Sequence, residues 1–292
     1  MGIVLKNGSA LFMGCSFTFG QNLYYDKWFD KLNRQELNFL NKRISDKFGN
    51  EGHNSWPNHN YMLSSEDYEY LFKHRTSRLV CDELNLHEIL PPFRFVNGGD
   101  NFTNFIDFYK WFEKYHEWIG CNDLILQDRK LKLVVFQLTY LSRTDPFFWT
   151  QKEEEADYIR ETLNIEFMSE KKFKNTKWES LVNYHTHKNL KRIKKMLNNV
   201  GCELLVWCGT PDFPMVENED FFVDIEYEGK KYNSFEEING VVGHCFSGQL
   251  PQIQSSGDFS EHQLQKIEDD HPNTAFNKLI TANILRKYHE RN

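Results

Sequence analysis

Three unbroken apolar runs constrain the fold of this chain more than any other feature. Residues 131–138 read Leu-Lys-Leu-Val-Val-Phe-Gln-Leu, residues 203–208 read Glu-Leu-Leu-Val-Trp-Cys, and residues 10–13 read Ala-Leu-Phe-Met. Runs of this length without polar alternation, ended by glycine or polar residues, are typical of strands that are buried on both faces. We therefore predict that all three are buried strands of one sheet.

Helical patterns separate these runs. One helix is predicted from aromatic and apolar residues at three- and four-residue spacing, namely Phe105, Phe108, Phe112, Tyr115 and Ile119. Further helices are predicted over residues 78–86, 178–199 and 274–289. Strands that alternate with helices in this way indicate an α/β protein with a parallel sheet covered on both faces.

Two shorter segments are candidates for additional strands. Residues 93–96 form a short run that ends in Asn97-Gly98-Gly99-Asp100-Asn101. Residues 221–227, followed by Gly229, fit either a fifth strand or a hairpin. With both included, the sheet has about five strands.

The size and composition of the chain favour one large domain. It has 292 residues, of which 40% are hydrophobic and 15% aromatic, with 25 phenylalanines, so it can bury a substantial core. Two stretches lack clear periodicity, at residues 21–75 and 145–175. We predict a single domain over residues 1–292 in which these stretches are insertions.

Charge and cysteine content exclude several classes of protein. The formal charge of −7 with interspersed signs argues against a nucleic-acid-binding face. The six cysteines are scattered without a Cys-x-x-Cys pair, which supports neither a zinc site nor a disulfide framework. His185 and His187 are two apart on a predicted helix, so they point to different sides and are not expected to share a metal. We expect no metal, no cofactor, no nucleic-acid partner and no membrane partner.

The N-terminal sequence bears on location. It carries one lysine, Lys6, and a five-residue apolar run, which is too short for a signal peptide. No stretch approaches transmembrane length. A cytoplasmic location is the expectation.

The segment after the first apolar run is the candidate site of chemistry. It reads Gly14-Cys15-Ser16-Phe17-Thr18-Phe19-Gly20. A serine just beyond a strand end is held where a ligand can approach, and flanking glycines allow a sharp turn, so Ser16 is a candidate nucleophile. In the alternative interpretation, Ser16 or Thr18 only caps the following helix.

Two distant segments supply the rest of a possible acyl-transfer site. Gly98-Gly99 follows a predicted strand and is suited to present backbone N–H groups to an anion, although a plain tight turn explains it equally well. Near the other end of the chain, Glu268-Asp269-Asp270-His271 combines carboxylates with a histidine. A serine hydroxyl needs an imidazole to accept its proton and a carboxylate to orient that imidazole.

Taken together, these segments resemble the conserved blocks of the SGNH or GDSL hydrolases. The segment from Gly14 to Gly20 is similar to their first block, Asn97-Gly98-Gly99-Asp100-Asn101 to the glycine block, and Asp269-Asp270-His271-Pro272-Asn273 to the acid–histidine block. The resemblance implies a three-layer α/β/α sandwich with a central parallel sheet of five strands in flavodoxin-like order. It also implies a serine esterase or acyl hydrolase that needs no metal.

Residue by residue, the resemblance implies a Ser-His-Asp triad of Ser16, His271 and Asp269. Ser16 and Gly99 would donate backbone N–H groups to an oxyanion hole. The acid in the family often lies three residues before the histidine, where this chain has Glu268, but Asp269 is the more usual residue type and is preferred.

The chain departs from the family at the third block. There an asparagine side chain normally completes the oxyanion hole, whereas residues 139–143 of this chain read Thr-Tyr-Leu-Ser-Arg. Asn101 is a candidate substitute from the neighbouring loop. Cys15 stands where the family commonly has aspartate, and it is not expected to be catalytic because nothing nearby in the sequence lowers a thiol pKa.

The expected function is hydrolysis of an ester of a short acyl group, and a carbohydrate is one candidate carrier of that group. One alternative is a catalytically silent protein of the same fold that binds or has a structural role. Another is an acyltransferase that uses the same residues.

Overall fold

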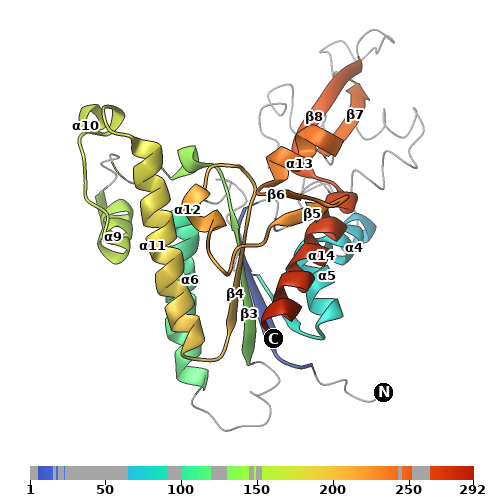
Figure 1. Ribbon diagram of the computed structural model, residues 1–292, viewed down its shortest axis with the longest axis horizontal. Helices are drawn as coiled ribbons and strands as arrows, with labels where there is room; N and C mark the ends of the chain where they lie inside the picture. The colour runs from blue at the N-terminus through green and yellow to red at the C-terminus, as the bar shows by residue number, and fades with distance from the viewer. Residues whose placement is uncertain are drawn as a thin grey trace.

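The computed structural model in Figure 1 describes residues 6–15, 18, 23, 65–90, 100–119, 130–144, 148, 153–242, 245–251 and 264–292. The strands that the argument uses are β1 (Ser9–Met13), β2 (His87–Ile89), β3 (Leu131–Leu138), β4 (Glu203–Cys208), β5 (Ile225–Tyr227), β6 (Lys230–Tyr232), β7 (Cys245–Pro251) and β8 (Leu264–Pro272). The helices are α4 (Ser65–His74), α5 (Thr76–Glu83), α6 (Asn101–Ile119), η4 (Leu141–Arg143), α9 (Glu153–Leu163), α10 (Glu170–Lys174), α11 (Trp178–Asn198), α12 (Pro214–Glu217), α13 (Phe235–Val242) and α14 (Thr274–Arg291).

Four parallel strands form the central sheet, in the order β2-β1-β3-β4. β1 lies between its two neighbours, with Leu11 opposite Ile89 on one side and Val134 on the other. β3 continues past β1 and pairs with all of β4, from Leu133 opposite Glu203 to Leu138 opposite Cys208. The predicted α/β class and parallel sheet are confirmed. The three apolar runs form β1, β3 and β4, of which β1 and β3 are interior and β4 ends the order.

Helices cover both faces of this sheet (Figure 1). Alternate strand residues point to opposite faces. Leu11 and Phe136 pack in the core with residues of α6 and α11. Phe12 and Val135 pack in a second core with residues of α5 and α14. Both sides of each strand are therefore buried, which explains the lack of polar alternation in these runs.

The segment after β4 combines both predicted alternatives. Phe222 forms an isolated parallel bridge with Val206 of β4, outside the named strands. β5 and β6 then pair as an antiparallel hairpin. Glu228 and Gly229 both have positive φ, at 49° and 74°, as a two-residue hairpin turn requires. The predicted hairpin is confirmed.

The edge strand β2 was not expected. The predicted helix over residues 78–86 ends at Glu83 as α5, and Asn85 with φ of 53° turns the chain into the strand. β2 has only three residues, all half-buried, so it lacks a strand pattern that sequence can show. The strand predicted at residues 93–96 lies outside the described residues.

The stretch at residues 145–175 contributes helices to the core. Ile159, Leu163 and Phe173 are buried in α9 and α10, in the same core as α6 and α11. The apolar pair Ile159 and Leu163 has helical spacing, but the many charged residues around it obscure the pattern. In the stretch at residues 21–75, Leu23, α4 and Arg75 are described and the rest is not.

The chain ends with an antiparallel hairpin and a long helix. β7 pairs with β8, and β8 leads directly into α14. The register of the hairpin shifts once, because Cys245 lies opposite Pro272 while Phe246 lies opposite Asp269. Two residues of β8, Asp270 and His271, thus fall between paired positions and form a bulge. None of the described helices has the length and apolar character needed to span a membrane.

Candidate functional site at the carboxyl edge of the sheet

The carboxyl ends of the parallel strands bring together segments that are far apart in the sequence. Gly14 follows β1, Thr139 follows β3 and Gly209 follows β4. α6 begins at this edge because Asn101 is bonded to Thr139. In open α/β sheets ligands bind at this edge, so it is the place to examine for a site.

Gln137 of β3 organises the segment after β1. Its side-chain oxygen Oε1 accepts hydrogen bonds from the backbone N–H of Cys15 at 3.0 Å and from the Thr18 hydroxyl at 3.0 Å. The Cys15 thiol is a third and longer donor, with Sγ 3.2 Å away. Gln137 is only 1% exposed, so these bonds lie in the protein interior. The Thr18 backbone N–H also donates to the Cys15 carbonyl at 3.0 Å and closes a turn across the segment.

Gly14 allows this close approach. A Cβ atom at position 14 would lie 2.8 Å from Gln137 Oε1 and even closer to the Thr18 hydroxyl. Both are far inside van der Waals contact, so a side chain at position 14 would push the Gln137 amide and Thr18 away. The glycine that sequence reasoning assigned to turn geometry is therefore also required for packing.

A second amide network joins α6 to the strand ends. Asn101 accepts from the Thr139 backbone N–H at 2.9 Å and donates to the Thr139 carbonyl at 3.1 Å. One turn later, Asn104 donates to the carbonyl of Gly14 at 3.1 Å. Asn101 is 1% exposed. The start of α6 is thereby fixed to the ends of both β1 and β3.

Asp100 begins α6 as a capping residue. Its Oδ1 accepts from the Thr103 backbone N–H at 2.7 Å, as an N-cap carboxylate does. Burial raises the pKa of Asp100, against the lowering effect of its hydrogen bonds with Thr103 and nearby backbone groups. The carboxylate is partnered within its own helix, so it serves the helix terminus.

The start of α14 reaches the same edge. Asn273 caps this helix by accepting from the Phe276 N–H at 3.0 Å. Asn277 accepts from the backbone N–H and the hydroxyl of Thr76, at 3.1 and 2.7 Å. Thr76 begins α5, which runs back along the sheet to β2. The residues just before α14 therefore enter the fold near the carboxyl ends of the strands.

The predicted site residues are described to different extents. Ser16 and Gly99 lie outside the described residues, although Cys15, Thr18 and Asp100 beside them are described. Asp269 and His271 belong to β8. His271 lies in the bulge and Asp269 directly before it, and only the backbone of these two residues is described. Glu268 pairs in register with Ser247.

The remaining site residue, Asn101, is fully described. It lies beside the end of β3, where the SGNH hydrolases have an asparagine that this chain lacks. The Thr139 backbone occupies its amide oxygen and one of its amide N–H groups.

Sequence reasoning missed Gln137 and Asn104. A signal for Gln137 was available, because it is a polar residue in an otherwise apolar buried strand, and such a group requires a partner. Asn104 gave no comparable signal, since polar residues are common on helices.

The two histidines of α11 serve packing and pairing. His185 is 7% exposed and packs edge-on against Phe148, and burial lowers its pKa to about 4. His187 instead pairs with Glu219, with Nε2 2.5 Å from Oε1. The predicted divergence of the two side chains is confirmed. Within the described ranges, no three histidine, cysteine or acidic side chains gather closely enough to hold a metal ion.

Comparisons of the chain with models of known protein families, with curated proteins and with solved structures find no match.

Proposed function

We propose that this protein is a serine hydrolase that cleaves an ester of a short acyl group, such as one carried on a carbohydrate. Ser16 is the nucleophile, His271 the general base and Asp269 the acid that orients it. The proposal extends the fold to an SGNH-like three-layer sandwich in which the segment around Phe222 is the fifth strand.

One observation carries the proposal. The segments that flank Ser16, Gly99 and His271 converge on the carboxyl edge of one parallel sheet. The segment after β1 is tied to β3 through Gln137, and α6 is tied to both strands through Asn101 and Asn104. Acyl transfer needs a nucleophile, a base and N–H donors in one place, and the described contacts bring their neighbours in sequence to one edge.

The bulge in β8 adds support from a different part of the chain. Bulges redirect side chains and are over-represented next to active sites. Here the extra residues are Asp270 and His271, directly before the helix that enters the same edge. In this proposal the bulge presents His271 to Ser16.

The proposed oxyanion hole uses the N–H groups of Ser16 and Gly99, with Asn101 as third donor. Each donor of this kind typically contributes a factor of about one hundred to one thousand in rate. Because the Thr139 backbone already occupies Asn101 in part, the remaining amide N–H of Asn101 is the group that would reach the substrate.

The contacts between Asn101 and the Thr139 backbone favour the catalytically silent alternative. Where an SGNH hydrolase has a free asparagine after the third strand, this chain has a threonine whose backbone groups are engaged by Asn101. A weakened oxyanion hole would leave a fold that binds its ligand without turning it over. The acyltransferase alternative uses the same residues and differs only in the acceptor.

The test compares Ser16→Ala with the matched control Ser142→Ala. Ser142 is an exposed serine in η4, at the same edge of the sheet. With a short-chain chromogenic ester, we expect Ser16→Ala to abolish turnover and Ser142→Ala to retain it. Turnover that survives in Ser16→Ala contradicts the proposal.

Labelling separates the alternatives. A serine-directed phosphonate should react with the wild-type protein and not with Ser16→Ala or His271→Ala. If the wild type reacts no faster than His271→Ala, the silent alternative holds. If the ester is consumed faster when an alcohol acceptor is added, and the acyl group appears on that alcohol, the acyltransferase alternative holds.

A further inference from the structure

We propose that Gln137 is a positioning residue that holds the segment around Ser16 from both sides through a single side-chain oxygen. Its consequence for catalysis rests on the proposed function, whereas its role in ordering the segment does not.

The register of the sheet places Gln137 for this role. Phe136 pairs with Met13, the last residue of β1, so Gln137 is the first residue of β3 beyond the end of β1. Its backbone neighbour on the other side is Trp207 of β4. The side chain therefore lies beside Gly14, where the chain leaves the sheet.

The orientation of the Gln137 amide follows from its partners. The backbone N–H of Cys15 can only donate, so the atom that faces it must be the amide oxygen. The Thr18 hydroxyl shares that oxygen, and the two bonds use its two lone pairs. The Cys15 thiol at 3.2 Å is the weaker third contact.

The positions of these bonds in the sequence give them their effect. Cys15 and Thr18 flank Ser16 and Phe17, so one atom fixes both ends of the segment that carries the proposed nucleophile. Gln137 and Thr18 are buried, at 1% and 4% exposed, so water cannot replace a lost bond.

The direct test is amide hydrogen exchange at Cys15, measured by residue-resolved NMR. In the wild type we expect this amide to be protected. In Gln137→Leu it should exchange at least roughly tenfold faster, because a buried hydrogen bond is lost. Gln137→Glu, which keeps an acceptor oxygen at this position and replaces the amide nitrogen with a second oxygen, should restore most of the protection.

Thr18→Val and Thr18→Ser guard against a Gln137 variant that fails to fold. Thr18→Val removes only the hydroxyl bond and leaves the Cys15 bond, so it should loosen the Cys15 amide less than Gln137→Leu does. Thr18→Ser keeps the hydroxyl and should behave as the wild type. The proposal is overturned if the Cys15 amide exchanges at the same rate in the wild type and in Gln137→Leu. If Gln137→Leu does not fold, the same comparison is made between the wild type and Thr18→Val.

The kinetic arm uses Asn189→Leu as a matched control. Asn189 is another buried amide, 2% exposed, which accepts from Tyr109 and donates within α11 away from this edge. We expect Gln137→Leu to lower kcat about 10- to 100-fold with little change in KM, since small misplacements of a reacting group carry costs of this size. Asn189→Leu should keep kcat within about twofold.

The two arms separate the two proposals. An unprotected Cys15 amide in the wild type refutes the role of Gln137, whatever the activity. A protected amide in a wild type that neither turns over ester nor reacts with the phosphonate refutes the hydrolase and leaves the ordering role of Gln137 supported. Equal kcat in Gln137→Leu and Asn189→Leu refutes the effect on catalysis.

Discussion

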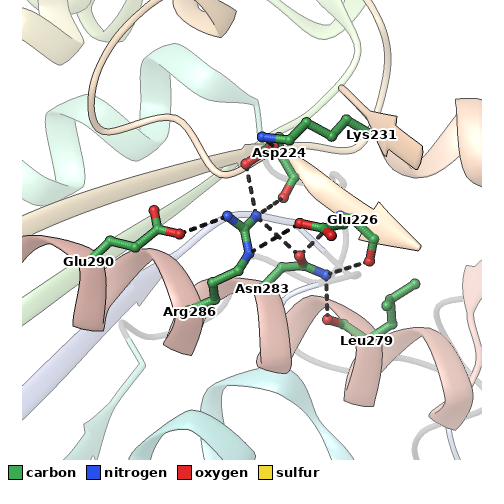
Figure 2. A network of polar contacts seen from close by, with 7 residues as sticks. All are labelled: Asp224, Glu226, Lys231, Leu279, Asn283, Arg286 and Glu290. Carbon is green, nitrogen blue, oxygen red and sulfur yellow. Dashed lines mark hydrogen bonds and ion pairs between the residues drawn. The ribbon is translucent and has the colours of Figure 1, made fainter. Parts of the chain in front are cut away.

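Two polar networks join distant segments of this chain, and they differ in charge and in burial. The network around Gln137 is uncharged and buried, and it joins β3 to the segment after β1. The network around Arg286 is ionic and partly exposed (Figure 2). There Arg286 of α14 donates to Asp224 Oδ1 at 2.9 Å, and Lys231 of β6 approaches the other oxygen at 2.5 Å.

The difference between them lies in access to water. Arg286 is 30% exposed and Asp224 17%, so solvent can hydrate these charges when a partner is removed. Burial opposes ionisation of Asp224, but hydrogen bonds from Lys231 and Arg286 outweigh it and hold the pKa of Asp224 below its usual value. The Gln137 partners have no such access. The neutral network should therefore matter more for stability than the charged one, although its bonds are weaker in isolation.

Gln137→Leu should give the largest loss. It leaves the Cys15 N–H and the Thr18 hydroxyl buried without their acceptor, at about 1–3 kcal/mol for each orphaned group, so we expect a loss of about 3 kcal/mol in the free energy of unfolding. Urea denaturation in 0.01 M and 1 M salt, where the screening length is about 30 Å and about 3 Å, should give the same loss. A loss that shrinks with salt would show that charge contributes to this region.

Gly14→Ala tests the packing of the same region without removing any hydrogen-bonding group. The added methyl group would collide with Thr18 and Gln137, and overpacking of this kind costs about 1–3 kcal/mol. We expect a loss of about 2 kcal/mol by urea denaturation. Gly201→Ala is the contrasting control, because φ at Gly201 is positive but nothing lies within 4 Å of an added Cβ. If Gly14→Ala is as stable as the wild type, the close approach is not a constraint.

His185 extends the comparison to a buried neutral imidazole that becomes charged when the pH is lowered. Its folded pKa of about 4 lies below the ordinary value of 6.5. Between these values the unfolded chain binds a proton that the folded chain does not, so this contribution to stability is lost as the pH falls from about 6.5 towards 4. By pH 5 the loss should be about 1–2 kcal/mol.

The measurement for His185 compares urea denaturation at pH 7 and pH 5. In His185→Leu the difference between the two pH values should be smaller than in the wild type. His187→Gln serves as the control, because His187 is paired with Glu219 and not buried in an apolar site. An unchanged pH dependence in His185→Leu would mean that folding does not lower the pKa of His185.

Arg286→Met should give the smallest effect. Lys231 still neutralises Asp224, and the network is open to solvent, so we expect a loss of at most about 1 kcal/mol. The loss should decrease further in 1 M salt, in contrast to Gln137→Leu. An effect of Arg286→Met larger than that of Gln137→Leu would reverse the comparison.

The strong periodic patterns allowed much of the fold to be predicted from the sequence. The unbroken runs identified β1, β3 and β4, and the spacing of apolar residues identified α6, α11 and α14. β2, with three half-buried residues, gave no pattern, and α9 was hidden by the charges around Ile159 and Leu163. The β7–β8 hairpin was also unforeseen.

For the candidate site too, some residues could be predicted from the sequence and some contacts depended on the fold. The sequence was sufficient to single out Ser16, Gly99 and His271 as chemically suitable residues, and these remain predictions. Asn101 was chosen as an oxyanion donor from its position in the sequence alone. That its amide would bond the Thr139 backbone, 38 residues away, depends on how α6 packs against the end of β3.

By itself the sequence determined β1, β3 and β4 and the apolar faces of α6, α11 and α14. Burial on both faces of a strand leaves a mainly apolar run, and burial of one helix face leaves three- and four-residue spacing, so both can be read locally. Only the tertiary structure decided that Gln137 would accept hydrogen bonds from residues 119 and 122 positions earlier. Such a contact depends on strand order and register, which place Gln137 one residue past the end of β1. Its partners are common residue types that gain their roles only when the sheet brings them together.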